Sequence, residues 1–128
     1  MVVMLDTNIA IGLRDGDPQI VEAIGKLDEA ILLSIITRVG LEGGVHRDRE
    51  ETGARRVRLD AILAVLPLVA FDDAATDAYR AIVEATGYSR RKMLDRMIAA
   101  QALVHRATLV TRNPSDFRDI PGLRIEVW

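Results

Sequence analysis

The stretch that decides the fold is the first one, Val2-Val3-Met4-Leu5-Asp6-Thr7-Asn8. Four apolar residues run directly into an acid, which predicts a buried strand with Asp6 at its carboxyl end. Open parallel sheets bind their ligands at that end of the strands. The same residues also fit a second interpretation, in which Asp6 only caps a helix whose apolar residues follow Asn8. This stretch by itself supports both interpretations about equally.

Apolar strands alternate with amphipathic helices along the rest of the chain. Such alternation predicts an α/β fold with a mainly parallel central sheet flanked by helices. We expect strands at residues 2–5, 30–34, 68–71, 107–110 and 123–127. Helices are expected at residues 9–13, 18–27, 35–46, 52–66, 73–85 and 93–105.

The composition is that of one globular domain. The chain has 128 residues, 49% hydrophobic and 28% charged, with a net charge of −2. A chain of this length buries roughly two thirds of its surface in one core, so we expect a single domain over residues 1–128. Cysteine is absent, which excludes disulfides and thiolate metal sites and fits a reducing cytoplasm. We expect a cytoplasmic protein without a signal peptide or a membrane span.

Four acids lie where a solvated surface residue is not expected. Asp6 ends the first strand, Asp116 follows the strand at 107–110, Asp95 lies in an apolar helical segment, and Glu42 precedes two glycines. If these carboxylates meet at one sheet edge, two of them at about 4 Å repel by roughly 4 kcal/mol at an effective dielectric of about 20. Protons or a cation must then offset the repulsion. All-oxygen ligands select a hard cation such as Mg²⁺ or Mn²⁺.

Other chemistry has little support in the sequence. The chain contains neither G-x-x-x-x-G-K-[ST] nor G-x-G-x-x-G, so it has no nucleotide-cradling loop. His46 and His105 have no second histidine at helical spacing and lie on polar or helix-terminal ground, so we do not expect them to bind a metal or to act in a catalytic triad.

Two basic segments accompany the acids. All but two of the 17 basic residues are Arg, whose planar guanidinium suits phosphate. The first segment, with arginines at 47, 49, 55, 56 and 58, fits a solvated helix face as well as it fits RNA. The second adjoins Asp95, and there we favour RNA contacts. The predicted RNA-binding residues are Arg90, Arg91, Lys92 and Arg96, together with Arg112.

Four segments, taken in order, resemble the motifs of the PIN domain family: residues 5–8, 37–42, 95–102 and 108–117. The length of the chain and the residues of its motifs look most like those of the VapC-type toxins of bacterial toxin–antitoxin pairs. The resemblance implies a parallel sheet wrapped by helices and a Mg²⁺- or Mn²⁺-dependent endoribonuclease that cleaves structured RNA such as tRNA or rRNA. It also implies a homodimer and inhibition by a small antitoxin. Some apolar residues of the middle helices either form an interface with such partners or belong to the core: Ile62, Leu63, Leu66 and Val83.

The resemblance also assigns roles to residues. The implied catalytic residues are Asp6, Glu42, Asp95 and Asp116, and the implied metal ligands are Asp6, Asp95 and Asp116. Supporting contacts would come from Thr7, Asn8, Thr111 and Asn113. Many relatives carry an acid where this chain has Asn113, so the fourth position is Asn113 or Asp116, and we assign the metal-facing role to Asp116.

Asn113 has a structural explanation as well, because Asn113-Pro114 fits the N-cap and first residue of a helix. Two other functions stay open. One is a catalytically weak RNA-binding module of the same fold, and the other is a metabolic enzyme for a small phosphorylated substrate.

Overall fold

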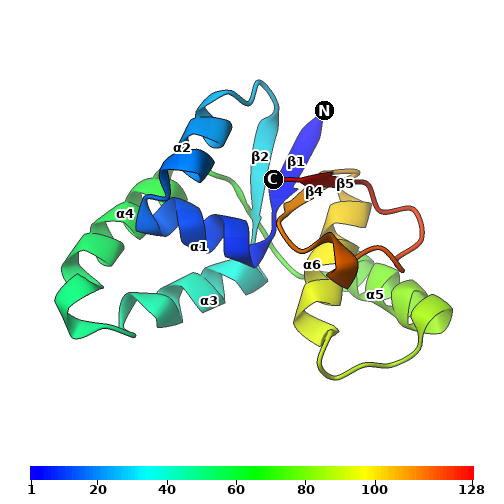
Figure 1. Ribbon diagram of the computed structural model, residues 1–128. Helices are drawn as coiled ribbons and strands as arrows, with labels where there is room; N and C mark the ends of the chain where they lie inside the picture. Colours follow the sequence, from blue (N-terminus) through cyan, green and yellow to red (C-terminus); the bar gives the residue numbers. More distant parts are fainter.

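The chain folds around a five-stranded parallel sheet that separates two groups of helices (Figure 1). This computed structural model describes residues 1–128. The strands are β1 (Val2–Leu5), β2 (Ala30–Ser34), β3 (Leu68–Val69), β4 (Thr108–Thr111) and β5 (Ile125–Val127). Their order is β3-β2-β1-β4-β5, and every neighbouring pair is parallel. The predicted α/β class with a parallel sheet is confirmed.

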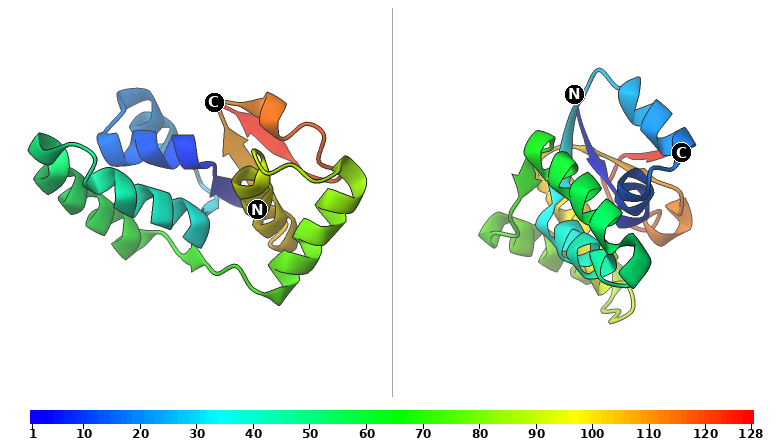
Figure 2. Two further views of the ribbon diagram at one scale, coloured as in Figure 1. Left: turned by 90° about the horizontal axis from the view of Figure 1, so that it is seen from below. Right: turned by 90° about the vertical axis from the view of Figure 1, so that its left-hand side faces the viewer.

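All six predicted helices are present. They are α1 (Thr7–Asp15), α2 (Pro18–Gly25), α3 (Ile35–Val45), α4 (Thr52–Val65), α5 (Asp73–Thr86) and α6 (Met93–Val104), with 3₁₀ turns η1 (Arg49–Glu51) and η2 (Pro114–Asp116). Helices α1 to α4 gather on one side of the sheet and α5 and α6 on the other (Figures 1 and 2). None of the helices has the length and hydrophobicity that crossing a membrane requires.

Helix α1 is longer than the sequence predicted. It begins at Thr7, directly after the strand, because the Asp6 side chain caps it. Thr7 and Asn8 are polar, so the spacing of apolar residues gives no sign that the helix already includes them. It ends at Gly16, whose φ of 77° is left-handed and whose N–H bonds the carbonyl of Gly12.

The central strand β1 is buried on both faces. Val3 and Leu5 belong to the core cluster shared with α1, α3 and α4, whereas Met4 belongs to the cluster shared with α5 and α6. Burial on both faces explains why this segment is apolar throughout and does not alternate. The sheet therefore holds β1 firmly and fixes the position at which Asp6 follows it.

A buried polar network joins α6 to the other side of the sheet. Ser34 caps α3 and also donates to Oε1 of Gln101 on α6. The Gln101 amide in turn donates to the carbonyls of Val69 (3.0 Å) and Ala70 (3.1 Å). The carbonyl of Ala70, just after β3, thus binds the Gln101 side chain. The strand predicted at residues 68–71 ends at Val69.

Candidate active site

Asp6 lies at the junction of β1 and α1. Its Oδ1 accepts a hydrogen bond from the backbone N–H of Thr7 (2.7 Å), and its Oδ2 accepts one from Oγ1 of Thr111 (2.8 Å) at the end of β4. The side chain therefore is a helix cap, as one interpretation of the first stretch predicted, and it lies at the carboxyl edge of the sheet. Each carboxylate oxygen keeps a lone pair that these bonds do not use.

Hydroxyl groups from three elements surround Asp6. Thr111 Oγ1 also accepts from the backbone N–H of Asn113 (2.9 Å), which ties the segment after β4 to the strand end. Oγ1 of Thr7 lies 3.0 Å from Oγ1 of the buried Thr37 on α3. These contacts fix the orientation of the strand end and the start of α1, because the hydroxyl groups of Thr7, Thr37 and Thr111 each have a partner.

Asp6, Asp95 and Asp116 lie close enough together at this edge for their charges to interact. Burial, followed by repulsion from Asp6 and Asp116, raises the pKa of Asp95 from 3.8 to about 6, with only Lys92 opposing. Burial also raises the pKa of Asp6; the hydrogen bonds from Thr111 and Thr7 oppose this rise, and the charge of Asp116 adds to it. The fold thus brings Asp6 and Asp116, which are more than 100 positions apart in sequence, into one cluster of like charges with Asp95.

The donor set fits a hydrated divalent cation. No three acidic or imidazole side chains converge closely enough to enclose a metal ion by themselves. Mg²⁺ usually keeps several waters and takes only one or two carboxylates from the protein, so such a cage is not required. All donors here are oxygens, and a cation would offset the repulsion between carboxylates that, after burial, raises the pKa of Asp95.

Glu42 is not part of this cluster. Its Oε1 lies 2.8 Å from Nη2 of Arg56 on α4, and this contact holds the pKa of Glu42 below its usual value. The α3 residue that faces the site is Gly40, where an added Cβ would lie 3.8 Å from Cγ2 of Thr7. Two positions along a helix turn by about 200°, so Glu42 faces α4 when Gly40 faces Thr7. The predicted catalytic role of Glu42 has no geometric support.

The predicted RNA-binding residues differ in availability. Arg96 is buried, and its guanidinium donates to Gly87 O (2.7 Å) and pairs with Asp119 (3.4 Å), so it cannot reach RNA and this part of the prediction is wrong. Lys92 lies 3.8 Å from Asp119, and Arg112 lies 3.3 Å from Asp17. Both keep part of their surface in solvent.

Arg90 and Arg91 are exposed and form no ion pair. They precede α6, the helix that carries Asp95 in its first turn. Of the predicted basic residues, this pair is the one most available to a ligand.

Two predicted supporting residues behave differently from expectation. Asn113 stands at the N-cap of η2, but its side chain makes no capping hydrogen bond, because η2 is a single 3₁₀ turn held by backbone bonds. The predicted structural role of that side chain is therefore wrong. Asn8 is exposed on the first turn of α1.

Sequence reasoning also missed three residues around this edge. Thr37 contacts Thr7, Gly40 faces it, and the buried Arg14 crosses from α1 to α3. The spacing of Thr37, Gly40 and Gly44 by three and four positions could have identified the α3 face that lies against α1.

Known proteins match the chain over its whole length. The PIN domain family model matches residues 3–123. Ribonuclease VapC2 of Rickettsia felis is 29% identical over 136 residues, covering 100% of this chain and 98% of the relative. VapBC2 from Rickettsia felis, solved bound to a promoter DNA fragment, includes a chain that matches with a TM-score of 0.85 and 28% identity, covering 100% of this chain and 99% of that one.

A third match is a toxin–antitoxin complex from Klebsiella pneumoniae, with a TM-score of 0.74, 25% identity and 94% of each chain covered. The motif-based family prediction is thus confirmed by sequence and by fold. The chain belongs to the PIN domain family and is a full-length homologue of a VapC-type ribonuclease.

Proposed function

We propose that the protein is a metal-dependent endoribonuclease, the toxin of a toxin–antitoxin pair, and that it cleaves structured RNA such as tRNA or rRNA. The observation that carries the proposal is the cluster of Asp6, Asp95 and Asp116, in which burial and then the two neighbouring carboxylates raise the pKa of Asp95. Homology to a ribonuclease supports RNA as the substrate class. The absence of a phosphate-binding loop argues against a metabolic enzyme.

In this proposal Asp6, Asp95 and Asp116 would hold a hydrated Mg²⁺ or Mn²⁺, one or two of them directly and the others through its water molecules. The bound cation supplies Lewis acidity toward a phosphodiester oxygen and lowers the pKa of water. The hydrogen bonds from Thr7 and Thr111 keep the Asp6 carboxylate in one orientation. Without a metal Asp95 has a pKa of about 6, so at neutral pH it is mostly ionised, the form that binds a cation.

RNA should be gripped by the exposed pair before α6. Replacing Arg90 and Arg91 together by Ala should weaken RNA binding and lower the slope of log affinity against log salt by about 0.7 for each phosphate that the protein no longer neutralises. Fluorescence anisotropy over a range of salt concentrations measures this slope. Arg80→Ala, which removes an exposed arginine from α5, is the control. A slope that changes equally in both variants would rule out a specific interaction.

We also propose an antitoxin partner and a homodimer. The structures of related toxin–antitoxin complexes support the first. An open apolar groove of about 250 Å³ supports a protein partner, and it contains two of the residues singled out in the sequence, Ile62 and Leu66. It is lined by Leu13, Ile24, Ala61, Ile62, Val65 and Leu66. Light scattering that shows a monomer at micromolar concentration would contradict the dimer.

The decisive experiment is cleavage of tRNA and rRNA by the purified protein with Mg²⁺ or Mn²⁺, compared with EDTA. We expect cleavage only with the metal. An Asp95→Asn preparation, purified in parallel, controls for contaminating nuclease. If the protein binds RNA but does not cleave it under either condition, the alternative of a catalytically weak RNA-binding module is correct.

A further inference from the structure

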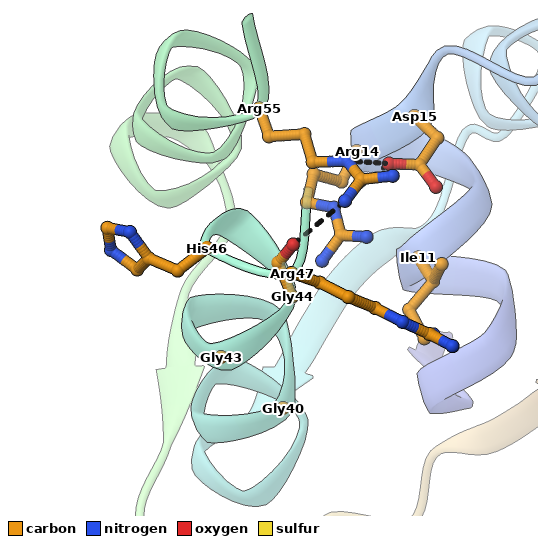
Figure 3. A pocket seen from close by; sticks show the side chains of 9 residues that line it. All are labelled: Ile11, Arg14, Asp15, Gly40, Gly43, Gly44, His46, Arg47 and Arg55. Atoms are coloured by element: carbon orange, nitrogen blue, oxygen red, sulfur yellow. Dashed lines mark hydrogen bonds and ion pairs between the residues drawn. The ribbon is translucent and has the colours of Figure 1, made fainter. Parts of the chain in front are cut away.

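A cavity lined by arginines lies between α1, the end of α3 and the start of α4, away from the aspartates (Figure 3). It has a volume of about 480 Å³. Three guanidinium groups line it, from Arg14, Arg47 and Arg55, with Asp15 as the only acid. Figure 3 shows the imidazole of His46 pointing away from them. The cavity is therefore a positively charged recess.

Two of the arginines are held in place by the protein. Oδ1 of Asp15 accepts from Nε of Arg14 (3.0 Å) and pairs with Nε of Arg55 (3.5 Å). Nη1 of Arg14 donates to Leu41 O (3.2 Å), and Nη1 of Arg55 donates to Gly44 O (3.0 Å). Nη2 of each residue makes no hydrogen bond within the protein. Two fixed cations thus line the cavity, each with an unused N–H donor group.

Arg47 has no such structural role. It follows the C-cap of α3, is exposed, and forms neither an ion pair nor a side-chain hydrogen bond. In Figure 3 its side chain extends across the cavity toward Ile11. Capping of the last α3 carbonyls accounts for Arg14 and Arg55, but it does not account for Arg47.

The recess adjoins a second cavity that lies beside the candidate active site. Gly40 lines both this cavity and a second, mainly apolar one of about 270 Å³ that includes Thr7, the residue after Asp6. Because Gly40 has no side chain, no Cβ projects from this position of α3 toward Thr7. Along α1, Thr7 and Arg14 are about 10 Å apart. A stacked strand of nucleic acid covers that distance in about three nucleotides.

We propose that Arg14, Arg47 and Arg55 bind a second phosphate of the RNA strand, about three nucleotides from the phosphate at the aspartates. The choice of RNA as ligand rests on the proposed function. Guanidinium forks match phosphate in shape and charge, and a preordered pair loses little side-chain entropy on binding. A strand lying over Gly40 reaches both sites, with its bases beside the apolar cavity.

The first test compares Arg47→Ala with Arg49→Ala, the same charge change two positions away and outside the cavity. Affinity for a fluorescent oligouridylate is measured in EDTA, so that no cleavage occurs. Arg47→Ala should weaken binding about tenfold, the effect of removing one charge-assisted hydrogen bond, and Arg49→Ala less than about twofold. Equal effects would overturn the proposal, even if RNA cleavage by the wild type is normal.

The second test does not depend on RNA cleavage. Titration of the full chain with inorganic phosphate, followed by NMR, should shift the Nε–Hε signals of Arg14 and Arg55 in a saturable way, and Arg47→Ala should weaken that binding. Absence of saturable shifts would overturn the proposal. Shifts in a protein that does not cleave RNA would support the phosphate site while the proposed function fails. If Arg47→Ala weakened binding of the cognate antitoxin but not of RNA, the recess would be a protein site and the proposal would be wrong.

Discussion

Asp95→Asn should abolish metal-dependent RNA cleavage and, at neutral pH, make the protein more stable. Loss of an outer-shell partner of a metal site costs up to about 100-fold, so loss of a ligand should cost more. Stability should rise because the folded state raises the pKa of this carboxyl from 3.8 to about 6, which disfavours the ionised form. After screening by solvent, the expected gain is about 1 kcal/mol, or about 3 °C in melting temperature.

The pH dependence of this gain gives a second check on Asp95. Between pH 3.8 and about 6 the folded wild type binds a proton that the unfolded chain has released, so its stability falls as the pH rises through this window. The advantage of Asp95→Asn should therefore be full above pH 6 and disappear toward pH 4. Thermal melts of both proteins across this range measure it, with the exposed Asp77→Asn as control. If Asp95→Asn cleaved RNA at the normal rate, Asp95 would not be a ligand of the proposed metal site.

Gly44→Ala should destabilise the protein although alanine favours helices. An added Cβ would clash with Nη1 of Arg14 and lie 3.1 Å from its Cζ, and this side chain is only 5% exposed. The guanidinium must then leave Leu41 O and Asp15 and move into the cavity. We expect a net destabilisation of about 1–2 kcal/mol, since breaking the hydrogen bond and the ion pair outweighs the helix propensity that alanine adds.

Gly43→Ala is the matched control for this effect. Position 43 is exposed, and an added Cβ there meets nothing within 4 Å. Alanine should stabilise α3 by up to about 1 kcal/mol, so the two neighbouring substitutions are expected to have opposite signs. Denaturant unfolding of both variants gives the free energies. If Gly44→Ala were as stabilising as Gly43→Ala, the contact between Arg14 and α3 would be absent in solution.

The sequence predicted well where the strand ends next to the candidate site lie. Asp6 and Thr111 follow apolar runs whose burial on both faces of a parallel sheet leaves a clear pattern, and the sheet brings their ends to one edge. Asp95 was recognised because an acid within an apolar helical segment has no ordinary surface explanation. For each of these residues, the pattern of the neighbouring sequence already indicates the position that the fold gives the side chain.

Residues on helices were predicted less well, because the sequence does not determine which side of a helix meets the sheet. Arg96 follows Asp95 directly and was assigned to the same surface, but successive helical residues point about 100° apart, and Arg96 is buried against Gly87 and Asp119. The predicted catalytic role of Glu42 lacks support for the same reason, because Glu42 lies on the side of α3 that meets α4. The residue that faces Thr7 is Gly40, and a glycine gives no hydrophobic or charged signal.

The hydrogen bond between Asp6 and Thr111 joins residues 105 positions apart, and it determines when the site can form during synthesis. β1 is made before the other four strands of the sheet, yet one of its two neighbours in the sheet is β4, which is made after β2 and β3. A nascent chain that already carries Asp6 and Asp95 still lacks the strand that orients the first of them. The candidate nuclease site therefore forms only after β4 has been synthesised, so a nascent chain that lacks β4 has no complete site with which to attack RNA.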